Sequence, residues 1–158
     1  MISEEVQPFI GKTAAPIIRE VEKGAVRRYA DAVGNNNPVY SDEEYAVKSK
    51  YGGIIAPPGF FGWPMKPVAS STGLADIVGD LQEALSKAGF PRILDGGISY
   101  EFFLPVRAGD TLVASPKVSK VVEKEGKSSA MMICDFETTY INQNGDMVAR
   151  SNQTFIAR

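Results

Sequence analysis

The chain has 158 residues, of which 44% are hydrophobic and 23% charged, so it is long and apolar enough to bury the core of one domain. Its formal net charge is −2 and its basic residues are scattered among acidic ones, so the sequence does not indicate a basic surface that would bind a nucleic acid. One cysteine and no histidine exclude an internal disulfide, a cysteine-based metal cluster, a Ser-His-Asp triad and a histidine-bound metal. We expect a single domain over residues 1–158 with neither a metal nor a cofactor.

The N-terminus and the hydropathy of the chain bear on its location. The first nine residues, MISEEVQPF, are acidic and lack the basic region and apolar core of a secretory signal. No stretch approaches the roughly 18 apolar residues that a membrane span requires. We therefore expect a soluble cytoplasmic protein without a membrane partner.

The N-terminal quarter predicts an arm, a strand and a helix. Residues 1–15 are expected to form a lead-in arm, and residues 16–21 alternate between apolar and polar as in a short edge strand. Residues 22–33 have helical apolar spacing, and Gly34 is a typical C-terminal stop for that helix.

A polar loop follows this helix. Residues 35–38 are three asparagines and a proline, which favour a turn because asparagine side chains bond the local backbone and proline disfavours helix before it. Ser41, with Glu44 three residues later, predicts a capping box for a second helix over residues 42–50. The loop is either a simple turn or a place that holds polar side chains between two helices.

An aromatic segment comes next. Residues 54–56 are expected to form a short buried strand, and residues 60–67 read FFGWPMKP. Pro64 and Pro67 would end a helix here after about one turn, because proline lacks an amide donor and its ring clashes with the preceding turn. The aromatic side chains then either plug the core or line an apolar channel.

Residues 76–89 predict an amphipathic helix. Its apolar side chains share one face, and Gly89 ends it. The residues of that face are Ile77, Leu81, Leu85 and Ala88. The helix could cover a pocket mouth, form an oligomer contact or cover ordinary core.

In the remainder of the chain the apolar residues recur with a period of two, which is typical of strands. Hairpin turns are predicted between these strands, the clearest being the Asn-Gly turn of residues 142–146. Cys134 lies in an apolar run of the third strand and is expected to be a buried structural thiol. The strands are predicted over residues 98–104, 111–122, 128–141 and 147–157. Helices followed by four consecutive antiparallel strands predict an α+β fold in which the helices cover one side of a meander.

The run AVGNNNPVY at residues 32–40 resembles the loop of the MaoC-like (R)-specific enoyl-CoA hydratases and 3-hydroxyacyl dehydratases. In that family an Asp and a His of this loop form the pair that adds or removes water. Asn35 stands where the Asp would be, and Tyr40 where the His would be. The positions that match the family are Gly34, Asn37 and Pro38, with an aliphatic residue after them. The pattern is most similar to the non-catalytic halves of two-part enzymes, such as the acyl-binding subunit of mycobacterial-type hydroxyacyl-acyl-carrier-protein dehydratases.

The resemblance implies a hotdog fold, an antiparallel sheet wrapped around a central helix that the prolines here would shorten. It also implies an acyl-CoA or acyl-carrier-protein thioester as the ligand, bound without a cofactor. No residue of this chain is then confidently catalytic. The residues expected to hold the acyl chain are Gly59, Phe60, Phe61, Trp63 and Met65.

Three functional hypotheses follow. The leading one is an acyl-binding subunit that pairs with a His-bearing MaoC-like chain, which supplies the Asp/His pair. The alternative is a stand-alone acyl-thioester-binding homodimer without chemistry. A third is a homodimeric enzyme that uses Tyr40 or an acidic residue, although a phenol is a poor base at neutral pH.

Overall fold

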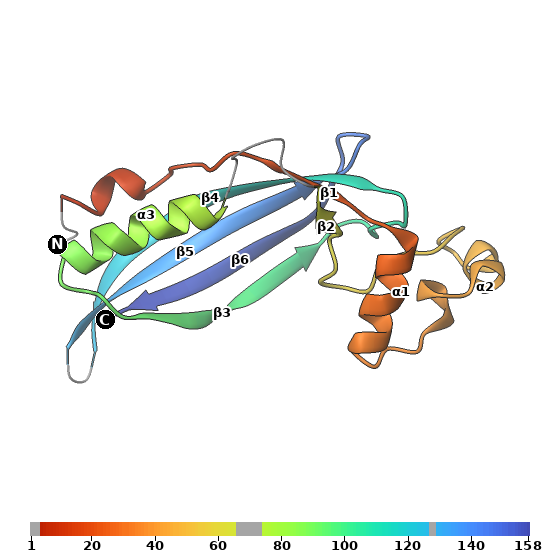
Figure 1. Ribbon diagram of the computed structural model, residues 1–158, viewed down its shortest axis with the longest axis horizontal. Helices are drawn as coiled ribbons and strands as arrows, with labels where there is room; N and C mark the ends of the chain where they lie inside the picture. The colour runs from red at the N-terminus through yellow and green to blue at the C-terminus, as the bar shows by residue number, and fades with distance from the viewer. Residues whose placement is uncertain (1–3, 66–73, 127–128) are drawn as a thin grey trace.

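The computed structural model describes residues 4–65, 74–126 and 129–158, with the side chains of 74–76 left out. A long, curled antiparallel sheet forms the body of the molecule, one helix lies across its inner face, and two shorter helices gather at the opposite end (Figure 1). None of the described helices is long and apolar enough to cross a membrane.

Within the described residues the elements are as follows. The helices are the 3-10 turns η1 (Gln7–Phe9) and η2 (Pro38–Tyr40) and the α-helices α1 (Lys23–Ala32), α2 (Glu43–Lys48) and α3 (Leu74–Lys87). The strands are β1 (Ile17–Glu20), β2 (Trp63–Pro64), β3 (Ile93–Phe102), β4 (Thr111–Glu125), β5 (Ala130–Ile141) and β6 (Met147–Ala157). The strands form one six-stranded sheet in the order β2-β1-β4-β5-β6-β3.

The sheet order corrects the predicted four-strand meander. Strands β4, β5 and β6 do form a meander, but β3 pairs with β6 at the far edge rather than with β4. The reason is that β1 occupies the side of β4, with Ile17 opposite Ala114 and Glu20 opposite Thr111. Strand β1 is itself flanked by the two-residue strand β2 instead of lying at the edge.

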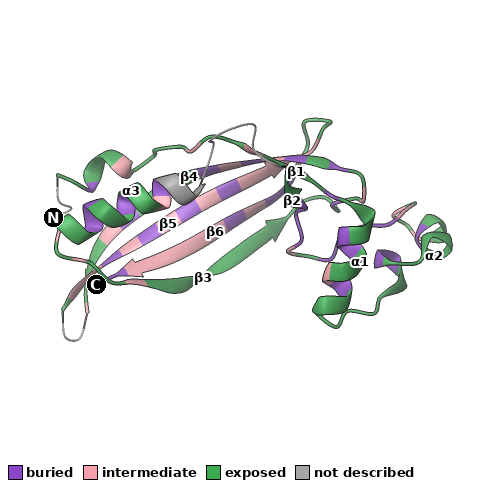
Figure 2. Cartoon of the chain, in the orientation of Figure 1, coloured by how far each residue is buried: buried purple, intermediate pink, exposed green. Residues whose placement is uncertain are grey.

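Helix α3 covers ordinary core, which was one of the three roles expected for it. Ile77, Leu81 and Leu85 are buried, and Ala88 packs against the same cluster. The helix packs on side chains from β3, β4, β5 and β6, and Figure 2 shows its buried side turned to the sheet. The sheet residues of this cluster are Ile93, Val118, Val121, Met132, Cys134, Phe136, Phe155 and Ala157.

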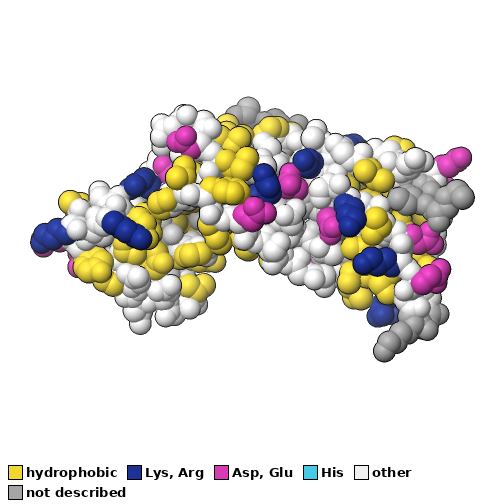
Figure 3. Space-filling view, turned by 180° about the vertical axis from the view of Figure 1, so that it is seen from behind, with side chains coloured by type: hydrophobic (Ala, Val, Ile, Leu, Met, Phe, Trp, Pro, Cys, Tyr) yellow, Lys and Arg dark blue, Asp and Glu magenta, His cyan; other side chains and the backbone are white. Residues whose placement is uncertain are grey.

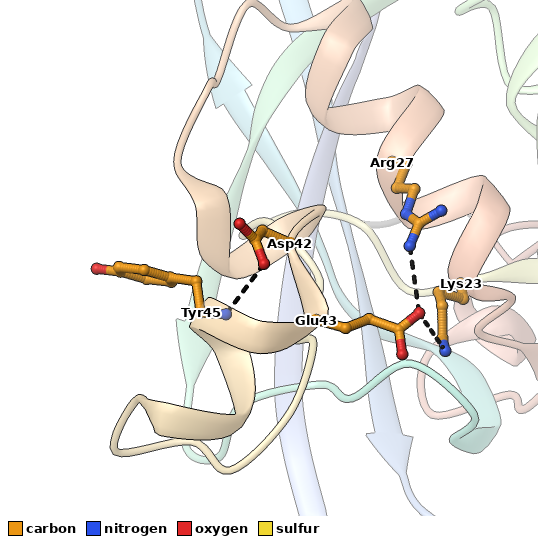
Figure 4. A network of polar contacts seen from close by, with 5 residues as sticks. All are labelled: Lys23, Arg27, Asp42, Glu43 and Tyr45. Carbon is orange, nitrogen blue, oxygen red and sulfur yellow. Dashed lines mark hydrogen bonds and ion pairs between the residues drawn. The ribbon is translucent and has the colours of Figure 1, made fainter.

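The predicted capping box at Ser41 and Glu44 is wrong, because the 3-10 turn η2 takes up Ser41. The amide of Ser41 donates to the carbonyl of Pro38, so α2 begins one residue later than predicted. Asp42 is the N-cap, accepting a hydrogen bond from the amide of Tyr45 at 3.0 Å (Figure 4).

Helices α1 and α2 are joined by an exposed ionic contact. The carboxylate of Glu43 lies 3.0 Å from Lys23 and 3.4 Å from Arg27 (Figure 4). The hydrogen bond from Lys23 lowers the pKa of Glu43. An exposed ion pair of this kind contributes little to stability.

The segment after α2 differs from the prediction in two places. Residues 54–56 are buried but form only an isolated bridge, between Ile55 and Arg107. Residues 60–65 contain no helical turn, so no central helix starts there, and Pro67 falls outside the described residues. The chain is extended instead, because Trp63 and Pro64 pair with β1, and α3 is the helix on the sheet.

Candidate functional site

An apolar pocket of about 290 Å³ lies where the sheet meets the end that carries α1 and α2. Seen from behind, hydrophobic side chains gather at this end of the molecule (Figure 3). The pocket is lined by Tyr40, Tyr51, Ile55, Ala56, Pro57, Pro58, Gly59, Phe60, Phe61, Phe102, Phe103, Leu104, Pro105 and Val106.

Backbone hydrogen bonds join two walls of this pocket. One wall is residues 55–61, and the other is residues 102–106, which leave strand β3. The amide of Ala56 donates to the carbonyl of Val106 at 2.8 Å, and the amide of Ala108 donates to Ile54 at 3.0 Å. The pocket is therefore built on paired main chain.

A buried carboxylate fixes the turn that ends the second wall. Asp110 is 5% exposed and accepts a hydrogen bond from the amide of Arg107 at 2.7 Å. Its other oxygen accepts from the side chain of Gln143 at 3.0 Å. The turn directly follows the pocket wall, which ends at Val106.

The predicted acyl-binding residues separate into two groups. Gly59, Phe60 and Phe61 line the pocket, whereas Trp63 and Met65 are 55% and 50% exposed and lie outside it. The last two border a separate depression of about 270 Å³ beside Glu20, Glu22 and Pro64. They are carried there because the chain runs extended along β1 after Gly62.

The two aromatic residues of the pocket face different neighbours. Phe60 lies 5.0 Å from the ring of Tyr29 and meets Trp63 edge-on at 5.8 Å. Phe61 stacks on Tyr140 with ring centroids 4.1 Å apart. Phe60 therefore packs toward α1, and Phe61 packs toward the sheet.

The two positions that the resemblance pairs with the catalytic Asp and His also lie in different surroundings. Tyr40 is 8% exposed and lines the pocket. Asn35 is exposed, is absent from the lining, and accepts a hydrogen bond from the amide of Asn37 at 3.2 Å.

The rest of the motif shapes the loop. Gly34 has φ +69°, Asn37 accepts from the amide of Val39 at 3.1 Å, and Pro38 begins η2. These residues close the turn that brings Tyr40 to the pocket.

The chemistry of the lining is that of an apolar binding site. Among its residues only tyrosines carry an ionisable group, so it offers hydroxyls but neither a carboxylate nor an imidazole. Burial, followed by the nearby Tyr140 and Tyr29, raises the pKa of Tyr100, which contacts Phe61 beside the pocket. No cluster of three or more potential metal-binding side chains occurs within the part of the chain that the structure describes.

Sequence reasoning missed the second wall, residues 102–106, together with Tyr51 and residues 55–58. The signal was present, since FFLPV places consecutive apolar residues and a proline where a strand should alternate. Such a break marks a segment that leaves the sheet and turns apolar side chains to a different neighbour.

Comparison with known sequences shows what the chain is similar to. Residues 8–151 match the model of the FAS1-like, dehydratase domain region. A UPF0336 protein of Streptomyces griseus is 30% identical over 155 residues, covering 96% of this chain and 94% of that protein. A probable enoyl-CoA hydratase alpha subunit of Thermomonospora curvata is 26% identical over 156 residues, covering 92% of this chain and 48% of that protein.

Solved structures show the same fold. A chain of the ChsH1-ChsH2 complex from Mycobacterium tuberculosis superimposes with a TM-score of 0.81 at 19% identity, covering 97% of this chain and 93% of that one. The HadBC (3R)-hydroxyacyl-ACP dehydratase complex from the same organism gives a TM-score of 0.66 at 22% identity, with 94% and 96% covered. The R-hydratase PhaJ1 from Pseudomonas aeruginosa gives 0.58 at 22% identity, with 94% and 81% covered. The predicted α+β hotdog fold is confirmed.

Proposed function

Because the chain belongs to the family of FAS1-like dehydratase domain regions and has the MaoC-like hotdog fold, we propose that it is the acyl-binding subunit of a hydratase or dehydratase. The reaction is the interconversion of 2-enoyl and 3-hydroxyacyl thioesters of coenzyme A or an acyl carrier protein. This chain holds the acyl group, and a partner supplies the Asp/His pair.

One observation carries the proposal: the pocket lining is apolar, and its ionisable side chains are tyrosines, among them Tyr40 at the position that the resemblance gives to the catalytic histidine. Water addition needs a group that takes a proton from water and one that gives a proton to the α carbon. An apolar lining can bind an acyl chain, whereas the tyrosine hydroxyls it carries are poor bases at neutral pH. Binding without catalysis is therefore the role that fits the geometry.

The partner we propose is a His-bearing MaoC-like chain. Two of the structural neighbours, ChsH1-ChsH2 and HadBC, are complexes of two named proteins. Among the residues that the structure describes, the edge strand β3 pairs with β6 alone, so its other backbone edge has no strand partner there and could accept one. Large apolar side chains on and just after β3 are also exposed, namely Leu94, Ile98, Tyr100, Phe102, Phe103 and Leu104.

The alternative is a homodimer that binds acyl thioesters without chemistry. The observation that favours it is that the apolar lining of the pocket suits an acyl group, whereas hydration needs an acid and a base that this lining does not offer.

Co-expression distinguishes the two functions. The chain is produced alone and with candidate His-bearing hotdog chains, and hydration of crotonyl-CoA and longer 2-enoyl-CoAs is assayed. We expect a stable complex whose activity exceeds that of either chain alone. Acyl binding without complex formation would favour the homodimer, and turnover by the single chain would contradict both.

A further inference from the structure

The ring of Phe61 forms the sheet side of the pocket. It is 6% exposed, stacks on Tyr140 at 4.1 Å with 15° between the ring planes, and lies 5.7 Å from Tyr100. Phe102, on the opposite wall, is parallel to it at 6.3 Å. Phe61 thus fills the space between the pocket and the inner face of the sheet.

The backbone on either side of this ring is tightly held. The guanidinium of Arg19 donates to the carbonyl of Phe61 at 3.2 Å and to that of Gly62 at 3.0 Å. Gly62 has φ +73°, and a Cβ on it would lie 2.4 Å from the carbonyl oxygen of Glu20. The chain at Phe61 cannot move away from β1 without losing these contacts, so its ring is a fixed part of the wall.

Beyond the ring of Phe61, on the side away from the pocket, the sheet carries a row of hydroxyl groups. Thr138, Ser151 and Tyr100 are register partners across β5, β6 and β3. Thr138 and Ser151 are buried, and this hydroxyl-bearing row lies between the apolar cluster around the pocket and the cluster beneath α3. Shortening Phe61 would extend the pocket along the sheet toward this row.

The size of the pocket limits what it can hold. Its volume of about 290 Å³ is at the low end of the range of about 300–1,000 Å³ that small-molecule sites span. A pocket at this end of the range suits a short acyl group better than a long one.

We propose that Phe61 sets the length of the acyl group that the pocket accepts, and that the native acyl group is a short one. This inference rests on the proposed acyl-binding function and adds a specificity-determining residue to it. The reason is geometric: the ring fills the path along the sheet that a longer chain would take.

The test measures affinity against chain length. Butanoyl-, octanoyl-, dodecanoyl- and hexadecanoyl-CoA are titrated by calorimetry against the wild-type chain and Phe61→Ala, with free coenzyme A as the blank. Each buried methylene should raise affinity about fourfold. In the wild type this rise should stop by octanoyl-CoA, and in Phe61→Ala it should continue to dodecanoyl-CoA. Emission of Trp63, whose ring touches Phe60 at the pocket wall, is a second readout.

Two further variants keep the test decisive. Phe61→Leu removes less volume and should move the limit in the same direction, which covers the case in which Phe61→Ala does not fold. Phe155→Ala is the matched control, because Phe155 packs beneath α3 against Phe136 and outside the pocket. It should lower the melting temperature without moving the length limit.

The possible results separate the two proposals. If the wild type binds butanoyl-CoA and the limit is the same in every Phe61 variant, the role of Phe61 is overturned while acyl binding stands. If no acyl-CoA binds the wild type better than free coenzyme A does, acyl binding and the role of Phe61 are both overturned.

Discussion

Asp110 and Gln143 are 33 residues apart in the sequence, yet the side-chain amide of Gln143 donates a hydrogen bond of 3.0 Å to the buried carboxylate of Asp110. The oxygen of the same amide accepts from the backbone of Thr111 at 3.0 Å. This pair ties the β5–β6 turn to the turn that follows the pocket wall, and stability should depend on it.

Asp110→Ala should lower the free energy of unfolding by about 1–3 kcal/mol, because it leaves the amide of Arg107 without its acceptor. Chemical denaturation of Asp110→Ala, Gln143→Ala and the double variant measures the coupling, which we expect to be near 1 kcal/mol. Asp146→Ala, at an exposed position in the same β5–β6 turn, is the control. Additive losses in the double variant would show that the bond contributes nothing.

Gly62→Ala should destabilise the chain by more than about 2 kcal/mol. A residue with a side chain is strained at φ +73°, and its Cβ would meet the carbonyl of Glu20. Gly53→Ala is the matched control, since a Cβ there meets nothing within 4 Å and its φ is not positive. Equal melting temperatures for the two variants would contradict the fixed geometry of the pocket wall.

The purified chain should not hydrate crotonyl-CoA. Its Asn35 carries an amide that does not titrate, and by the family resemblance Tyr40 stands where the imidazole would be. Turnover is followed by the loss of enoyl absorbance, and a His-bearing hotdog enzyme serves as the positive control. Sustained turnover by homogeneous protein would show that the chemistry is misassigned.

Asn35→Asp with Tyr40→His should raise hydration above that of either single variant. A gain would place both positions at a competent site. Because Asn35 is exposed while Tyr40 lines the pocket, we expect this gain to be far below the rate of a natural enzyme. A double variant no better than its singles would argue against a shared site.

Ile98→Glu should weaken association of the chain with itself or its partner. Ile98 is 49% exposed on the edge strand β3, and a charge there would face the apolar surface of any neighbouring chain. Light scattering across a concentration series measures the effect. Val47→Glu, at a 63% exposed position on α2, should leave the mass unchanged. If the wild-type chain stays monomeric both alone and when mixed with a candidate partner, the expected association does not occur and the prediction has no basis.

Cys134 should react slowly with a disulfide reagent in the folded protein. Burial raises the pKa of its thiol from 9.0 to about 11, so very little thiolate is present near pH 8, and the side chain is covered by α3. Unfolding lowers the pKa again and should give rapid labelling. Fast labelling of the native protein at pH 8 would show that the cluster under α3 opens readily.

Local pattern was sufficient for much of the fold. The apolar spacing of residues 22–33 and 76–89 predicted α1 and α3, because a helix places such residues on one face whatever lies opposite. The Asn-Gly turn predicted the β5–β6 hairpin, because few residues adopt its backbone angles. The motif at 32–40 identified the family, although its most diagnostic residues are the ones that differ.

Only the tertiary structure decided which segments meet. Strand β3 has the same alternation whether it pairs with β4 or β6, and the choice follows from β1 already lying beside β4. Trp63 seemed as suited to the pocket as Phe61, yet pairing with β1 turns it outward while Phe61 stacks on Tyr140. The second wall, residues 102–106, reaches the pocket through hydrogen bonds to residues about 50 positions earlier. A sequence pattern records which residues prefer burial, but the neighbours that bury them are set by long-range pairing.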